Sequence, residues 1–214
     1  MTTHDSVQVP AAKRAPDLRE RRRQETRLEI SRAALELFEL HGSSATTVDE
    51  IARRAGVSPS TFFRCFATKE DSALSVEVEF ETEIVEWLDA IPADDVTLTG
   101  MQEIYGNIIE RLEASPDRRD RILRVRRLLA SDPHLCASSF ATESMALIQL
   151  TDRVAIKLGG ENARPYARLL VESAAMTTRI AVDTWAERLD NGAEADLAQI
   201  YRSTCEDLRR AAAS

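Results

Sequence analysis

The sequence contains few of the residues that break helices and few that form covalent or metal cross-links. Its 214 residues include seven glycines, seven prolines and three cysteines, and only 5% are aromatic. Cys65, Cys136 and Cys205 are far apart and form no CxxC pair, which argues against a disulfide framework or a structural zinc site. The three histidines do not cluster with the cysteines. We therefore expect no metal, no cofactor and a location in the reducing cytoplasm.

Long apolar runs are also missing. No stretch approaches the roughly 18 uncharged apolar residues that could span a bilayer. Residues 1–16 are polar and aperiodic, and we expect a disordered tail rather than a signal peptide. The net charge is −8, but residues 1–69 hold 12 Lys and Arg against 9 Asp and Glu, whereas residues 70–214 hold 16 against 27. A basic front on an acidic body is an asymmetry that can orient a protein on DNA.

The remaining chain is rich in Ala, Leu, Glu and Arg at helical spacing, with no alternating run long enough for a sheet. This pattern predicts an all-α fold of about nine helices. The first begins near Asp17 and ends at Gly42, Thr47 opens a capping box at the second, and Ser58-Pro59 begins the third. A single fourth helix is expected between Thr68 and Pro92, and five more at 98–114, 117–131, 138–158, 163–190 and 194–212.

The second and third predicted helices are short, and their connection is informative. Only four residues around Gly56 separate them, and neither is long enough to be stable alone. They must pack on each other and on the long helix before them. This is the helix-turn-helix arrangement, whose second helix is presented to a DNA major groove.

Residues 22–75 closely resemble the DNA-binding domain of the TetR family of transcriptional regulators. The resemblance rests on the motifs "ALELFELHG" and "TTVDEIARRAGVSPSTFFRCFATKED" and on their spacing. It implies a DNA-binding domain over residues 17–75, with the helix-turn-helix at about 47–66. It also implies a ligand-binding and dimerisation domain over residues 76–214.

Three phenylalanines crowd the second of the two short helices. Phe62 and Phe66 are one turn apart and share a buried face, whereas Phe63 points about 100° away among polar residues. The resemblance implies that Phe63 faces DNA, at a position where the family usually has tyrosine. Without a hydroxyl, its ring can still pack on a sugar or on a thymine methyl.

Other DNA contacts follow from position in the same pattern. Pro59 and Ser60 are expected at base edges, and Thr61 and Lys69 resemble the family's phosphate contacts. Arg64 is either a DNA contact or a solvated surface charge. The arginines near the start of the first helix either contact phosphates or form a salt-bridged helix start. The full predicted set is Arg22, Arg23, Arg27, Thr47, Ser58, Pro59, Ser60, Thr61, Phe63, Arg64 and Lys69.

Two apolar stripes, on the helices at 163–190 and 194–212, predict a homodimer. Two such helices from each subunit would form an isologous four-helix interface, and a symmetric operator needs two reading heads at a fixed separation. The alternative is that both stripes are monomer core. The predicted interface residues are Leu169, Leu170, Thr177, Ile180, Ala181, Trp185, Leu197, Ile200, Tyr201, Thr204 and Leu208.

The sequence gives the fewest indications of which effector the protein binds and where. Large residues on the central helices are candidates for a pocket, with core packing as the alternative: Trp87, Tyr105, Phe140, Met145 and Met176. Six arginines lie between Arg118 and Arg127, and "RRLLASDPHL" resembles a subset of TetR-family regulators with acyl-CoA-like ligand domains, including regulators linked to mycofactocin. An aliphatic body with these arginines at its mouth suits a long-chain acyl-CoA; the alternative is that the arginines are merely solvated.

We expect a sequence-specific DNA-binding regulator, a repressor that a small molecule releases from its operator. An architectural DNA-binding protein is one alternative, although the narrow basic footprint disfavours it. An all-α enzyme is the other. It is disfavoured because the sequence has no Gly-rich phosphate loop, no GxSxG and no HExxH.

Overall fold

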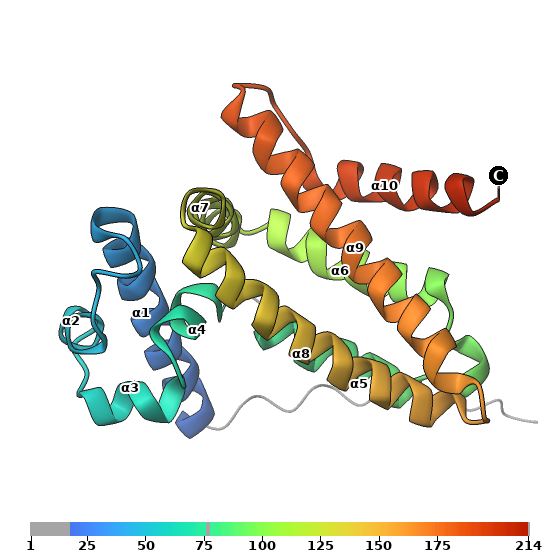
Figure 1. Cartoon of the computed structure of the whole chain (residues 1–214), viewed down its shortest axis with the longest axis horizontal. Coiled ribbons are helices and arrows are strands. Elements are labelled where there is room, and N and C mark those ends of the chain that lie inside the picture. Colours follow the sequence, from blue (N-terminus) through green and yellow to red (C-terminus); the bar gives the residue numbers. More distant parts are fainter. Residues whose placement is uncertain (1–17, 76–77, 214) are drawn as a thin grey trace, which may run out of the picture.

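The computed structural model describes residues 18–75 and 78–213, and every regular element within these ranges is helical. The predicted tail at 1–16 lies outside them. The described helices, which include no membrane-spanning candidate, divide into a head and a body (Figure 1). The head consists of α1 (Leu18–His41), α2 (Val48–Arg54), α3 (Pro59–Cys65) and α4 (Lys69–Leu74). The body consists of α5 (Val78–Ala90), η2 (Ala93–Asp95), α6 (Leu98–Glu113), α7 (Pro116–Ser131), α8 (Pro133–Leu158), α9 (Ala163–Asp190) and α10 (Leu197–Ala212).

Local signals start and end the head helices as predicted. At α2 the Thr47 N–H donates to Glu50 Oε2 at 2.8 Å, and the Glu50 N–H donates to Thr47 Oγ1 at 3.3 Å, which completes the capping box. Ser58 Oγ accepts the Thr61 N–H at 3.1 Å and so caps α3. Gly56, with φ of 68°, makes the turn between the two helices in a conformation that other residues rarely adopt.

The single helix predicted between Thr68 and Pro92 is wrong. The chain forms α4, which ends at Leu74, and a separate α5 that begins at Val78. The sequence carries no proline or glycine there to signal a break. The break coincides with polar contacts to α1, because Ser31 Oγ donates to the Ser72 carbonyl at 2.5 Å and Ser75 Oγ lies 3.2 Å from Ser31 Oγ.

Two later helices begin elsewhere than predicted, and a carboxylate explains each start. α8 begins at Pro133 rather than at 138, because Asp132 Oδ1 accepts the N–H groups of His134 and Leu135, each at 3.0 Å. α10 begins at Leu197 rather than at 194, because the Asp196 side chain accepts from the backbone N–H of the third residue in that helix.

Three apolar clusters hold the molecule together. The cluster that unites α1 to α4 also contains Val125 and Leu128 from α7 and Leu135 from α8. A second cluster packs α6, α9 and α10 around the fully buried Trp185. A third joins α5, α6, α8 and α9, with α8 and α9 forming a long antiparallel hairpin whose arms diverge toward α7 (Figure 1). The head therefore shares its core with the corner between α7 and α8.

Candidate DNA-reading interface and body cavity

Helix α3 has one face in the core and one face in solvent. Phe62 is fully buried and Phe66 is 5% exposed, whereas Phe63 is 59% exposed. The rings of Phe62 and Phe63 meet edge to face with centroids 5.5 Å apart, so the buried ring supports the exposed one. The predicted burial of Phe62 and Phe66 is confirmed. The contact between Phe63 and DNA stays a prediction.

The exposed side of α3 begins with polar groups. Ser58, Pro59, Ser60 and Arg64 are all exposed, while Thr61 is half-buried with its hydroxyl 3.0 Å from Ser58 Oγ. This edge of α3 is exposed and offers hydroxyl, apolar and guanidinium groups side by side.

The hydroxyl of Thr47 is already engaged. Its Oγ1 donates to Glu50 Oε2 at 2.8 Å, and the hydrogen bonds from Thr47 lower the pKa of the Glu50 carboxyl. The Thr47 side chain therefore caps α2, and its contact with a phosphate stays a prediction.

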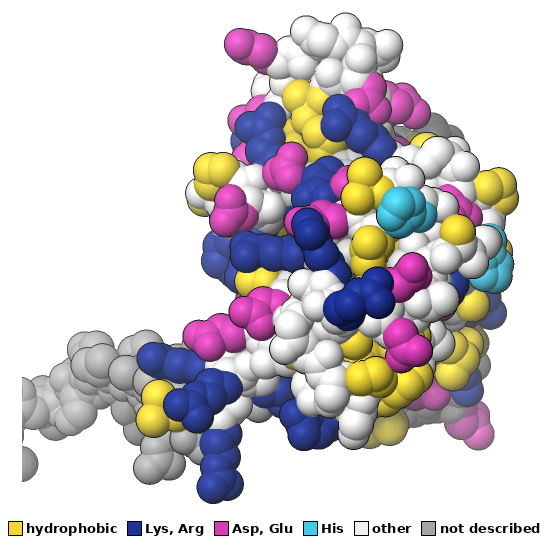
Figure 2. Space-filling view, turned by 90° about the vertical axis from the view of Figure 1, so that its left-hand side faces the viewer, with side chains coloured by type: hydrophobic (Ala, Val, Ile, Leu, Met, Phe, Trp, Pro, Cys, Tyr) yellow, Lys and Arg dark blue, Asp and Glu magenta, His cyan; other side chains and the backbone are white. Residues whose placement is uncertain are grey.

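The arginines of α1 do not behave alike. Arg22 and Arg23 are exposed. Arg27 instead donates from Nη1 to the carbonyl of Cys65, and its guanidinium lies 4.2 Å from the centroid of the Phe66 ring. Arg27 thus fastens α1 to the end of α3, a role that sequence reasoning missed. Figure 2 views the molecule from this end and shows Lys and Arg side chains interspersed with Asp and Glu.

Lys69 is also turned inward. Its Nζ donates to the carbonyls of Ser43 at 2.6 Å and Thr46 at 2.8 Å, and lies 3.9 Å from a carboxylate oxygen of Glu70. These partners make Lys69 a cross-link between α4 and the α1–α2 loop. The predicted phosphate contact stays a prediction, and it competes with this internal network.

Asp132 joins the head to the body. Besides capping α8 with Oδ1, it accepts through Oδ2 from the hydroxyl of Ser43 at 2.5 Å and from the Ser43 N–H at 3.3 Å. These hydrogen bonds, that from the Ser43 hydroxyl first, lower the pKa of the Asp132 carboxyl. The α7–α8 corner is thereby tied to the α1–α2 loop, and through it to Lys69.

Most arginines of helix α7 have partners on neighbouring elements, although Arg118 and Arg127 are exposed. Arg124 donates to both carboxylate oxygens of Glu39 on α1, at 2.8 and 2.6 Å, and this pairing raises the pKa of Arg124. Arg121 contacts the hydroxyls of Ser31 and Ser75. Further partners are the Ala195 carbonyl and the Trp185 ring for Arg119, Asp183 for Arg126, and Asp190 for Arg127. The arginines connect α7 to its neighbours.

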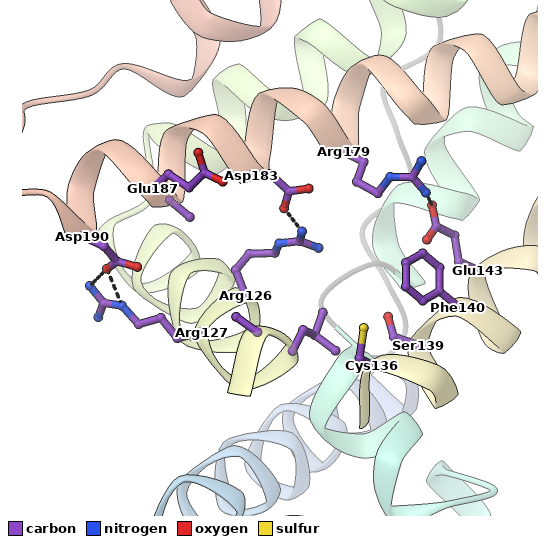
Figure 3. A pocket seen from close by; sticks show the side chains of 13 residues that line it. Arg126, Arg127, Cys136, Ser139, Phe140, Glu143, Arg179, Asp183, Glu187 and Asp190 are labelled. Atoms are coloured by element: carbon purple, nitrogen blue, oxygen red, sulfur yellow. Dashed lines mark hydrogen bonds and ion pairs between the residues drawn. The ribbon is translucent and has the colours of Figure 1, made fainter. Parts of the chain in front are cut away.

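The predicted pocket residues do not come together. A cavity of about 520 Å³ lies between α7, α8 and α9 (Figure 3), and of the five predicted residues only Phe140 lines it. Met145 and Met176 are exposed, while Trp87 and Tyr105 pack against the apolar clusters. The lining residues are Arg126, Arg127, Leu129, Ala130, Cys136, Ser139, Phe140, Glu143, Arg179, Asp183, Ala186, Glu187 and Asp190.

The predicted dimer interface is largely monomer core. Seven of its eleven residues are buried within the chain itself: Leu170, Thr177, Ala181, Trp185, Leu197, Ile200 and Tyr201. Thr204 and Leu208 are half-buried on α10, whose apolar stripe packs against α6 and α9. Their burial favours the alternative of monomer core, and the predicted interface stays a prediction. Leu169 and Ile180 are exposed, at 66% and 44%, and Tyr166 and Met176 extend the same stripe of α9.

A buried side-chain amide in the body lacks a hydrogen-bond partner among the described residues. Gln102 on α6 is only 5% exposed, and neither Nε2 nor Oε1 of its side-chain amide has a hydrogen-bond partner among the described residues. Its backbone carbonyl accepts from the Tyr201 hydroxyl at 3.0 Å, and burial raises the pKa of Tyr201. The described residues contain no cluster of three or more His, Cys, Asp or Glu suited to a metal ion.

An exposed second helix on a packed three-helix scaffold defines a helix-turn-helix DNA-binding protein. Residues 30–74 match the model of the bacterial regulatory proteins of the tetR family. The HTH-type transcriptional regulator TcmR of Streptomyces glaucescens is 29% identical over 96% of this chain and 92% of its own length. Residues 30–74 are thus a DNA-binding domain of the tetR type, and the chain is a DNA-binding transcriptional regulator similar to TcmR over most of its length.

Two other similarities are narrower. A Mycobacterium tuberculosis protein named as a mycofactocin biosynthesis transcriptional regulator, MftR, is 49% identical over 49 residues, which are 23% of this chain and 25% of that protein. A Clostridium perfringens protein named as a fatty acid metabolism regulator superposes with a TM-score of 0.50 at 19% identity, over 83% of this chain and 94% of that one. The second similarity concerns the fold alone.

Proposed function

We propose that this regulator is a homodimeric repressor that a small molecule releases from its operator. The observation that carries the proposal is the shared core of head and body, since Val125, Leu128 and Leu135 are buried in the same cluster as the head helices. A change in the body therefore has a packed route to the reading helix. The proposal places the protein in the cytoplasm and assigns it no catalytic reaction.

At the operator, α3 lies in the major groove. Pro59 and Ser60 meet base edges, Phe63 packs on a sugar or a thymine methyl, and Arg64 contacts a base or a phosphate. Arg22 and Arg23 supply sequence-independent phosphate contacts, which add affinity and salt dependence. The exposure of all these side chains supports this arrangement.

The dimer forms through α8 and α9 rather than α9 and α10. Leu169, Met176 and Ile180 expose one apolar stripe on α9, and Met145 and Ile148 are exposed on the adjoining α8. A hairpin of two long helices from each copy gives the four-helix interface that a symmetric dimer needs. Such a stripe is otherwise unusual on a monomer surface.

The operator half of the proposal is tested by footprinting the protein on its host genome and measuring binding to the recovered sites by fluorescence anisotropy. Ser60→Ala should relax the preference at one base pair by about 0.5–1.5 kcal/mol, the net worth of one hydrogen bond. Ser203→Ala, on the exposed face of α10, is the control and should bind as the unaltered protein does. Equal affinity for recovered sites and random DNA would instead indicate an architectural protein.

The dimer is tested by sedimentation at micromolar concentration. A double variant, Leu169→Glu with Ile180→Glu, should sediment as a folded monomer, because four charges would face one another across the symmetric interface. Ser203→Glu adds a surface charge away from the stripe and should remain dimeric. A double variant that is still dimeric would place the interface elsewhere.

A long-chain acyl-CoA as effector stays a prediction, and the structure weakens its basis. The arginines expected to hold its phosphates have partners on α1 and α9 and at Ser75, which follows α4. Operator release titrated with palmitoyl-CoA, with free CoA and a plain detergent as controls, decides the matter. Release by palmitoyl-CoA alone would support the prediction, and equal release by the controls would remove it.

A further inference from the structure

The cavity between α7, α8 and α9 has the size and the mixed lining of a small-molecule site. Its volume of about 520 Å³ lies within the usual range for such pockets. Figure 3 shows Phe140 and Cys136 on the α8 side, facing the charged residues of α7 and α9. Leu129 and Ala186 add apolar surface, so one part of the lining suits a hydrophobic group.

The charged part of the lining is negative on balance. Three arginines line the cavity, and each pairs with a carboxylate that also lines it: Arg126 with Asp183, Arg127 with Asp190, and Arg179 with Glu143. Glu187 lies between the two paired aspartates on the same face of α9. It pairs with no cation in the part of the chain that the structure describes. An anionic ligand would have to displace a carboxylate from one of the arginines, whereas a cationic ligand could pair with Glu187 directly.

The cavity wall includes both sides of the corner that holds the head. Ala130 precedes Asp132 by two residues and Cys136 follows it by four, and both line the cavity. Asp132 holds Ser43, which is 1% exposed and whose carbonyl accepts from Lys69. A buried polar group that loses its hydrogen-bond partner destabilises the fold, so a movement of the α7–α8 corner either moves the α1–α2 loop with it or weakens the loop.

We propose that this cavity is the effector site, that it takes an amphipathic molecule with a positively charged group, and that Asp132 and Ser43 couple its occupancy to the reading helices. The apolar group contacts Leu129 and Phe140, and the cation lies at Glu187. A bound molecule spreads α7 and α8 where they meet, because a packed wall accommodates added volume by shifting. This inference rests on the proposed effector-released function.

Cys136 permits a test without knowledge of the natural effector. It is partly exposed within the cavity, whereas Cys65 and Cys205 are buried. Two methanethiosulfonate reagents of similar size are used, one with a trimethylammonium group and one with a sulfonate, and each rate is divided by the rate with a free small thiol. The cationic reagent should be favoured about fivefold, because the net negative charge of the lining attracts the trimethylammonium group and repels the sulfonate.

The charge preference has its own control. Glu187→Gln keeps the size of the exposed side chain and should reduce the preference toward equality, while Glu172→Gln, on the same helix but outside the cavity, should leave it unchanged. Cys136→Ser identifies any reaction at the buried cysteines. Equal rates, or a faster anionic reagent, would overturn the assignment of a cationic ligand.

The coupling between the cavity and DNA binding is measured as the change in operator affinity when the trimethylammonium group is attached to Cys136. In the unaltered protein, attachment should weaken operator binding within the range of about 5- to 150-fold that allosteric coupling usually spans. Ser43→Ala removes the hydroxyl contact to Asp132, and Asp132→Asn keeps the α8 cap while weakening that contact. Both variants should bind the operator before attachment and respond to it several-fold less.

The outcomes separate this inference from the function on which it rests. Specific operator binding that attachment leaves unchanged would overturn the effector site and leave the regulator intact. Equal release in Ser43→Ala, Asp132→Asn and the unaltered protein would overturn the coupling role of Asp132 and Ser43. Loss of operator binding in both variants before attachment would show that the contact builds the DNA-binding state rather than transmitting release. Absence of specific operator binding in the unaltered protein would contradict the proposed function itself.

Discussion

The head and the body differ in how directly their sequences specify their structures. In the head, caps at Thr47 and Ser58 and the turn at Gly56 define each element within three or four residues. In the body, long amphipathic helices are equally clear as helices, but their apolar stripes do not say which neighbour covers them. Seven predicted interface residues are covered by the chain itself. Local sequence signals define where each helix begins and ends, but only tertiary packing decides what covers its apolar face.

The largest expected effect contrasts two neighbouring phenylalanines of the head. Phe62→Ala should cost about 3–5 kcal/mol of unfolding free energy, because it leaves a cavity among buried side chains. Phe63→Ala should lower stability by only about 0.5–1.5 kcal/mol, the worth of its contact with the Phe62 ring, and yet weaken operator binding. Urea unfolding and anisotropy measure the two effects. A Phe63→Ala protein that binds the operator normally would place the wrong face of α3 in the groove.

A second contrast in the head is between Lys69, which stabilises the fold, and Arg22, which is proposed to contact DNA. Lys69→Met should lower stability by about 1.5–3 kcal/mol, because two carbonyls lose a charged donor. The slope of log affinity against log salt should stay unchanged. The sequence-based phosphate contact instead requires that slope to fall by about 0.9. Arg22→Met is the matched control, because its exposed side chain should reduce the slope without lowering stability.

In the body, a gain of stability is expected from removing a polar group. Gln102→Met should stabilise the protein by about 1 kcal/mol, because the buried amide has no partner among the described residues and methionine has a similar shape. Thermal unfolding measures the change. Gln149→Met, at an exposed position of α8, should be neutral. A destabilised Gln102→Met would mean that the amide is bound by water or by a ligand.

The smallest expected effect is the pH dependence of the junction between the two regions. The pKa of Asp132 is lowered in the folded state, so its contribution is present above the unfolded pKa and is lost as pH falls through the folded value. Stability should therefore decline below about pH 4. Ser43→Ala removes the largest cause of the shift and should flatten that decline. An identical acid profile in Ser43→Ala would show that Ser43 does not perturb Asp132.

The sequence by itself determined the fold class, the helix-turn-helix and the exposure of Phe63. These depend on residues close together in the chain, where capping, glycine conformation and helical periodicity act. It did not determine the break after Leu74, the inward turn of Lys69 or the partners of the α7 arginines. Lys69 meets carbonyls 23 and 26 residues away, and Arg124 meets Glu39 at a separation of 85.

Tertiary structure alone decided which apolar stripe remained free and where a cavity was left. An amphipathic stripe has the same free energy of burial whether its cover is a neighbouring helix or a second subunit, so its sequence pattern is the same in both cases. Trp185 and Leu169 lie on the same helix with the same predicted role, and they end fully buried and 66% exposed. The cavity likewise arises from the angle at which α8 and α9 diverge, which no residue of either helix encodes separately.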